Sequence, residues 1–172
     1  LKNNNCLVTN SNRLVASLQF ARSESAKRNR NVSLRPIDGA WRNGFQIVMD
    51  EDQPGCSGVG DVDGSGTCTN DAVMKIIELG CGDANIARGL QIENLDSAGS
   101  ASVANFTYRS SGRLTTSSQN RRFGICMAGF VGASATDGNE RGRVVAVSNI
   151  GRPSTTRVDI TACPILSAQY GP

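Results

Sequence analysis

The stretch LKNNNCLVTNSNRLVASLQFARSESAKRNR, residues 1–30, predicts one long helix, and the rest of the chain must fold onto that helix. An apolar stripe recurs along this stretch at helical spacing, and it consists of Leu7, Leu14, Leu18 and Ala21, with Val15 beside it. Serine and asparagine fill most of the opposite face, and no proline or glycine interrupts the run. Such a helix is about 45 Å long, which exceeds what a domain of this size needs.

The end of this helix carries a distinctive cationic segment, Ala21–Arg30, in the turns where the helix dipole favours positive charge. The β-type run Asn31–Leu34 follows, and then Trp41–Asp50 with the pattern W-x-x-G-F-x-I-V-x-D; SNIGR stands late in the chain. Together with LVASLQFARSESAKRNRNVSL, this order resembles the FimT/FimU minor pilins and the related GspH pseudopilins. The most specific part of the resemblance is ARSE-x-x-x-R-N at the helix end.

The resemblance implies an architecture and a set of partners. In that family the helix is the exposed half of a longer one, whose preceding half is an apolar membrane segment that becomes the spine of a filament. We therefore expect an apolar segment of roughly 20 residues directly before Leu1, which anchors the parent protein in the bacterial inner membrane. The expected partners are other major and minor pilins, contacted through the N-terminal helix. The expected location is the inner membrane and periplasm before assembly and the cell-surface pilus afterwards.

The remaining chain consists of short β-type runs separated by Ser-, Gly- and Thr-rich connections, which predicts antiparallel sheet. With 172 residues and 18.1 kDa, the chain fits one domain. We predict an α+β, pilin-like fold in which residues 1–30 are the C-terminal half of the pilin helix and residues 31–172 a β-rich head. The later strands are expected at Val73–Glu78, Gly89–Glu93, Val103–Tyr108, Phe123–Met127, Arg143–Ser148 and Arg157–Thr161.

The chain has six cysteines, no C-x-x-C pair and no histidine, so disulfides are favoured over a zinc site. Disulfides place the domain in an oxidising compartment such as the periplasm or the cell surface. Six cysteines allow fifteen pairings, and the sequence does not choose among them. The pairing we consider first joins Cys126 to Cys163 and Cys56 to Cys68, which leaves Cys6 and Cys81.

Charge is distributed unevenly, and this pattern points to a polyanionic partner. Residues 1–49 carry a net charge of +6, residues 50–96 of −8 and residues 97–172 of +5, and 15 of the 18 cations are arginines. FimT-like DNA-binding pilins are similar in having Gly-Arg-x-Arg near the C-terminus; here Gly151 and Arg152 match, and the second arginine of the motif is absent. We therefore predict non-specific binding of double-stranded DNA. The candidate residues are Arg141, Arg143, Gly151, Arg152 and Arg157, with Arg121 and Arg122 as flanks.

The acidic middle contains an Asp- and Gly-rich loop that resembles part of a calcium loop. Asp61 and Asp63 occupy the first and third positions, but Ala72 stands where a bidentate carboxylate belongs, and only Asp71 lies nearby. We expect weak or no calcium binding and no cofactor, because a solvated hairpin loop explains the same residues.

Catalysis is not expected, since the chain lacks histidine and its carboxylates gather in a loop rather than across an apolar cleft. Three functions fit the sequence: a DNA-binding minor pilin for uptake in natural transformation, a purely structural FimU-like minor pilin, and a GspH-like pseudopilin of a type II secretion system.

Overall fold

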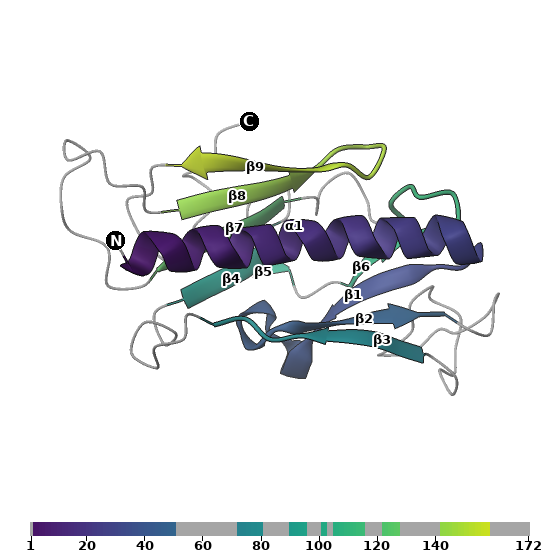
Figure 1. Cartoon of the computed structure of the whole chain (residues 1–172), viewed down its shortest axis with the longest axis horizontal. Coiled ribbons are helices and arrows are strands. Elements are labelled where there is room, and N and C mark those ends of the chain that lie inside the picture. The colour runs from purple at the N-terminus through teal and green to yellow at the C-terminus, as the bar shows by residue number, and fades with distance from the viewer. Residues whose placement is uncertain are drawn as a thin grey trace.

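The computed structural model describes residues 2–50, 72–80, 90–95, 101–102, 105–115, 122–127 and 142–158 of the chain. It begins with the long helix α1 (Lys2–Arg28), which crosses the whole molecule (Figure 1). The later elements are β1 (Val32–Pro36), the 3-10 helices η1 (Ile37–Gly39) and η2 (Trp41–Asn43), β2 (Phe45–Met49), β3 (Ala72–Ile77), β4 (Leu90–Leu95), β5 (Ala101–Ser102), β6 (Phe106–Tyr108), β7 (Arg122–Met127), β8 (Gly142–Val147) and β9 (Pro153–Val158).

The predicted apolar stripe of α1 is confirmed, because Leu7, Leu14, Leu18 and Ala21 are each at most 1% exposed and belong to the core. Val15 is half-buried and packs against the same core. None of the helices that the structure describes has the length and apolar character needed to span a bilayer.

The helix ends through a local backbone motif. Asn29 adopts a left-handed conformation with φ of 53°, and the backbone N–H of Arg30 donates to the carbonyl of Ser25 at 3.2 Å. In the last turns the Arg28 guanidinium donates to the Glu24 carboxylate at 2.6 Å, and this hydrogen bond lowers the pKa of Glu24. The cationic helix end predicted from the sequence is therefore closed by an asparagine cap and an internal ion pair.

The prediction that serine and asparagine occupy the outer face of the helix is wrong for four residues, which are buried. Each of their side chains donates to a carbonyl three or four residues earlier, as Ser17 does to Arg13 at 2.8 Å. Because these hydrogen bonds satisfy the side-chain polar groups within the helix, the four side chains can be buried. The four residues are Asn10, Ser11, Ser17 and Ser25.

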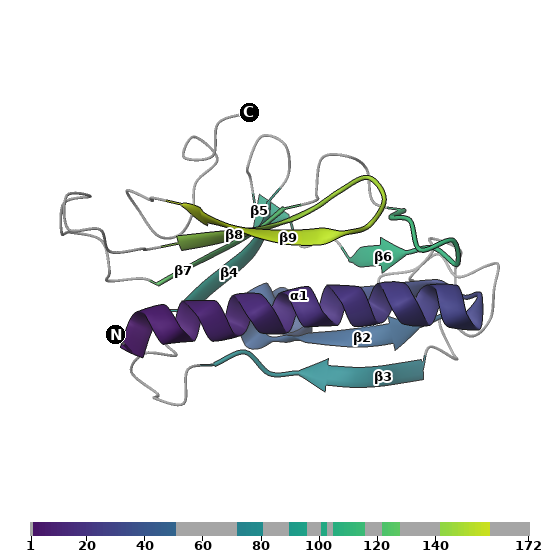
Figure 2. The ribbon, with the colours of Figure 1, turned by 45° about the horizontal axis from the view of Figure 1, so that its top comes forward.

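The head consists of two antiparallel sheets rather than one, and α1 contacts strands of both. The first sheet has the order β3-β2-β1-β6 and the second β5-β4-β7-β8-β9. In Figures 1 and 2, β2 and β3 of the first sheet lie on one side of the helix and β8 and β9 of the second sheet lie on the other. The helix thus closes the gap between two sheets, which explains why so much of its circumference is buried.

Aromatic side chains join the two sheets behind the helix. The Trp41 ring on η2 meets the Phe123 ring on β7 edge-on, with 4.9 Å between centroids. Phe123 also contacts Phe106 on β6 at 5.3 Å, and Phe106 contacts Tyr108 at 5.8 Å. All four are buried, so this row is the centre of one shared core.

Two late strands differ from their predicted positions. The last described strand begins at Pro153 rather than Arg157, because the preceding turn is short and pairing with β8 starts directly after it. Proline is accepted there because β9 is an edge strand. The short strand β5 lies between the predicted strands Gly89–Glu93 and Val103–Tyr108, and its residues Ser102 and Ala101 pair with Asn94 and Leu95.

Candidate functional site

The late SNIGR motif forms the turn of the β8–β9 hairpin. The N–H of Ser148 donates to the carbonyl of Arg152 at 2.9 Å, and the N–H of Gly151 donates to the carbonyl of Ser148 at 2.8 Å. The Ser148 hydroxyl also accepts from the N–H of Arg152 at 3.1 Å. This network holds Arg152 at the tip of the hairpin with its side chain exposed.

Gly151 anchors this turn to the rest of the molecule. Its φ is 80°, and a Cβ at this position would lie 2.6 Å from the carbonyl oxygen of Gly112 and 2.9 Å from the Tyr108 ring. The Tyr108 hydroxyl donates to the Gly151 carbonyl at 3.2 Å, and the Arg22 guanidinium donates to that of Gly112 at 3.2 Å. Three distant segments therefore meet here: the ARSE motif of α1, the loop after β6 and the SNIGR turn.

Tyr108 is the buried titratable group of this junction. Burial raises the pKa of its phenol well above the ordinary value of 10, and the positive charge of Arg22 acts in the opposite direction. The phenol therefore stays protonated at neutral pH and can always donate its hydrogen bond to the Gly151 carbonyl, which suits a structural role.

Three exposed arginines gather around the junction, and we call Arg109, Arg113 and Arg152 the arginine cluster. Arg109 and Arg113 close the loop after β6 through hydrogen bonds of 2.7 Å, from the N–H of Arg109 to the Arg113 carbonyl and from the N–H of Gly112 to the Arg109 carbonyl. Because Gly112 packs against Gly151, this loop adjoins the turn that carries Arg152. Neither described segment, 105–115 or 142–158, contains an aspartate or glutamate.

Sequence reasoning missed Arg109 and Arg113, because the Ser-Ser-Gly turn between them reads as a plain connection. One local feature of the sequence could have identified them as candidate phosphate-binding residues: two arginines flank a tight turn, and segment 105–115 contains no aspartate or glutamate. Their approach to Arg152 depends on packing and has no counterpart in sequence spacing.

The other predicted arginines do not form one patch with Arg152. Arg143 and Arg157 are cross-strand partners on β8 and β9, on the sheet face that also carries the buried Val145. Arg157 lies five residues beyond Arg152, about 17 Å along the strand. Arg122 pairs with Ala146 and faces the opposite side of the sheet. Arg121 and Arg141 lie outside the described residues.

A family described as "Type II transport protein GspH" matches residues 10–151, which is most of the chain. The chain belongs to the GspH family. No functionally curated protein matches the chain significantly. Members of this pilin-related family are structural subunits rather than known enzymes.

A solved structure supports the same fold. A crystal structure of the type IV minor pilin FimU of Pseudomonas aeruginosa (strain PAO1) has a TM-score of 0.53 and 22% sequence identity, and the match covers 89% of this chain and 90% of FimU. A second FimU crystal form gives a TM-score of 0.49 and 20% identity, over 87% of this chain and 92% of that one. The α+β, pilin-like fold predicted from the sequence is thus confirmed. The GspH match ends at Gly151, so it includes the anchoring glycine of the junction and stops before Arg152.

The cysteine and calcium predictions for this GspH-family chain are only partly covered by the described residues. Cys6 and Cys126 are both disulfide-bonded. Cys56, Cys68, Cys81 and Cys163 lie outside the described residues, so the predicted pairing stays a prediction. The loop with Asp61, Asp63 and Asp71 also lies outside them, and the part of the chain that the structure describes contains no group of acidic or cysteine side chains that could hold a metal.

Proposed function

We propose that this chain is a non-enzymatic filament subunit, a minor pilin or pseudopilin, that assembles with other pilins through the outer face of α1. The observation that carries this proposal is the chemistry of that face. Between Asn3 and Ala21 the only charged residue of the helix is Arg13. The exposed residues at successive spacings of three and four are Asn5, Thr9, Asn12, Ala16, Gln19 and Ser23.

A helix face that remains in water usually carries charged side chains. Small and uncharged side chains suit close packing against another helix, because they leave no charge to desolvate. Membership of the GspH family and the FimU-like fold support the same assembly. The parent protein is then anchored in the inner membrane and faces the periplasm before it enters the filament.

Charge insertion tests the assembly. In the full-length protein, Asn12→Glu with Gln19→Glu places two carboxylates on the outer face, and we expect the subunit to be lost from purified filaments while its amount in the cell is unchanged. The matched control is Thr156→Glu, an exposed position on β9 that pairs with Val144 on the sheet face away from the helix. Incorporation of the double variant at the wild-type level would overturn the proposal.

Two filament systems are compatible with the chain. The description of the family concerns type II transport, whereas FimU is a type IV minor pilin. We favour a type IV minor pilin at or near the pilus tip, because the fold matches FimU over nearly its whole length. Deletion of the gene should then reduce piliation and leave secretion of folded exoproteins intact; the reverse phenotype assigns the chain to type II secretion.

A second function, DNA binding for uptake in natural transformation, is favoured by the arginine cluster. Arg109, Arg113 and Arg152 are exposed and adjoin one another across the Gly112–Gly151 contact. Arginine's planar fork binds phosphate well. None of the large apolar side chains that the structure describes as exposed is aromatic, so stacking on single-stranded bases is not favoured. The cluster therefore suits the phosphates of a duplex, without sequence preference.

Fluorescence anisotropy of a labelled random duplex at several salt concentrations tests this function. Three phosphate contacts predict that log affinity falls with log salt at a slope of roughly −3. Arg109→Gln with Arg113→Gln and Arg152→Gln should abolish binding. Arg157→Gln should change it little if the interface is the cluster rather than the cross-strand pair Arg143 and Arg157. Absence of binding at low salt, or an unchanged slope in the triple variant, would leave a purely structural FimU-like pilin.

A further inference from the structure

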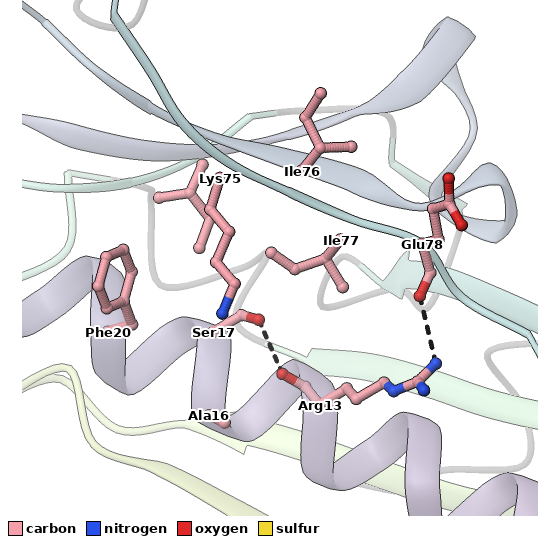
Figure 3. Close-up of a pocket in the computed structure, with 9 residues that line it drawn as sticks. Arg13, Ala16, Ser17, Phe20, Lys75, Ile76, Ile77 and Glu78 are labelled. Carbon is pink, nitrogen blue, oxygen red and sulfur yellow. Dashed lines mark hydrogen bonds between the residues drawn. The ribbon is translucent and has the colours of Figure 1, made fainter.

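A pocket lies between α1 and β3 (Figure 3). In Figure 1, β3 lies on the opposite side of the helix from β8 and β9. Its volume is about 300 Å³. Its apolar lining includes Phe20, Ile47 and Ile77, and its polar lining consists of Arg13, Ser17, Lys75 and Glu78. The pocket is separate from the arginine cluster, and neither proposed function uses its polar groups.

The two cations of this pocket have no carboxylate partner in the described part of the chain. The Arg13 guanidinium donates to the backbone carbonyl of Glu78 at 3.4 Å. Figure 3 shows the Glu78 carboxylate pointing away from that guanidinium. Lys75 Nζ lies 5.8 Å from the centre of the Phe20 ring, so its contact is with an aromatic face. The pocket therefore combines an apolar floor with two cations and one carboxylate, a net charge of +1, and neither cation forms an ion pair within the described residues.

The strand beside the pocket is an edge of its sheet. β3 pairs with β2, and no other described strand lies along its outer edge. Two of its residues, Val73 and Ile76, are large apolar side chains with 52% and 58% exposure. Lys75 is paired with Ile47 and points towards the helix, whereas Ile76 points away from it (Figure 3). An unpaired strand edge of this kind can pair with another strand. One face of β3 borders the pocket, and the other face carries the exposed apolar side chains of Val73 and Ile76.

We propose that β3 and the adjoining pocket bind an extended acidic segment of a partner protein by adding it to the sheet as a further strand. Main-chain hydrogen bonds to the edge supply general affinity, and side chains at alternate positions supply specificity. A glutamate or aspartate opposite Lys75 enters the pocket between Lys75 and Arg13, with the Ser17 hydroxyl nearby. Apolar neighbours on the other face of the added strand cover Val73 and Ile76. Charge complementarity thus selects an acidic segment over a basic one.

The test uses the folded chain and a fluorescein-labelled peptide of about six residues in which glutamate alternates with valine, a length that matches an ordinary strand. We expect saturable binding, with backbone amide NMR shifts concentrated at residues 72–78 and on the facing turns of α1. Lys75→Gln and Arg13→Gln should each weaken binding about two- to fivefold, as expected for an exposed ion pair. The control is Lys27→Gln, which removes an exposed cation from α1 away from the pocket.

Two matched peptides separate the parts of the proposal. A peptide with glutamine in place of glutamate should bind the wild type more weakly than the glutamate peptide does, whereas the double variant Lys75→Gln with Arg13→Gln should bind the two peptides equally. A peptide N-methylated at alternate residues should lose binding, because it cannot donate to the strand edge. Equal binding of the N-methylated peptide, or of the glutamine peptide to the wild type, would overturn the proposal. Self-association of the chain by sedimentation that Lys75→Gln abolishes would also overturn it, because the edge would then belong to a second copy.

Discussion

Gly151 shows at the scale of one residue why the SNIGR turn requires a glycine. Its φ of 80° and the 2.6 Å approach of the Gly112 carbonyl to the position of a Cβ both exclude a side chain. We expect Gly151→Ala to lower the free energy of unfolding by about 1–3 kcal/mol through backbone strain alone, with further loss from the clash. Urea denaturation followed by circular dichroism measures the change.

Gly80 provides the comparison for that substitution. A Cβ at Gly80 has no heavy atom within 4 Å, so Gly80→Ala should alter stability by less than about 0.5 kcal/mol. If both alanine variants were equally stable, the junction of Gly151, Gly112 and Tyr108 would not be the anchor that we describe.

Tyr108 gives a pH-dependent prediction at the same scale. Because burial raises the pKa of its phenol, the protonated form is favoured in the folded state, so its contribution to stability is present below pH 10 and is lost progressively as the pH rises above that value. In an ultraviolet titration of the native protein, we expect the Tyr108 phenol to ionise only with alkaline unfolding.

The chain has one other tyrosine, Tyr170, which lies outside the described residues and serves for assignment. In Tyr170→Phe the titration signal that remains belongs to Tyr108. A normal transition near pH 10 in that variant would contradict the buried hydrogen bond from Tyr108 to the Gly151 carbonyl.

At the scale of an element, α1 owes its position to its apolar stripe more than to its own propensity. Leu14 is fully buried in the core, so Leu14→Ala should cost about 2–5 kcal/mol of stability through lost burial and a cavity. Alanine is at least as good a helix former as leucine, so the loss cannot come from helix propensity.

Gln19→Ala is the matched substitution on the exposed face of the same helix. It should shift the urea midpoint by an amount that corresponds to less than about 0.5 kcal/mol. Equal effects of Leu14→Ala and Gln19→Ala would show that α1 is not held by this stripe.

At the scale of the whole molecule, one helix and one row of aromatic rings connect two sheets. Trp41 is the single tryptophan, it is buried, and its contact with Phe123 joins η2 to the second sheet. We expect tryptophan fluorescence and far-ultraviolet circular dichroism to report coincident unfolding transitions, because neither sheet keeps its core without the other. Separate midpoints for the two signals would mean that the sheets unfold independently.

The helix, its buried stripe and its end were predictable because they depend on local signals. Leu7, Leu14 and Leu18 repeat at helical spacing, and the Ala21–Arg30 segment has the composition of a helix C-terminus. The prediction of an outer polar face failed for Ser17 and the three other buried polar residues of α1. A side chain that forms a hydrogen bond within its own helix can be buried at little cost in free energy. The start of β9 was predicted wrongly because proline is disfavoured in strands. Pro153 is accepted because β9 lies at the edge of its sheet, which the sequence does not show.

The element types, the pilin-like class and the family resemblance could all be predicted from the sequence, since periodicity, caps and motifs are properties of neighbouring residues. Three features became visible only in the folded molecule: the head has two sheets, Arg109 and Arg113 adjoin Arg152, and Lys75 and Arg13 border one pocket. The physical reason is that strand order and helix packing bring together residues separated by tens of positions. A one-residue change of strand register reverses which side chains share a face, and such long-range pairing is not written in any local pattern.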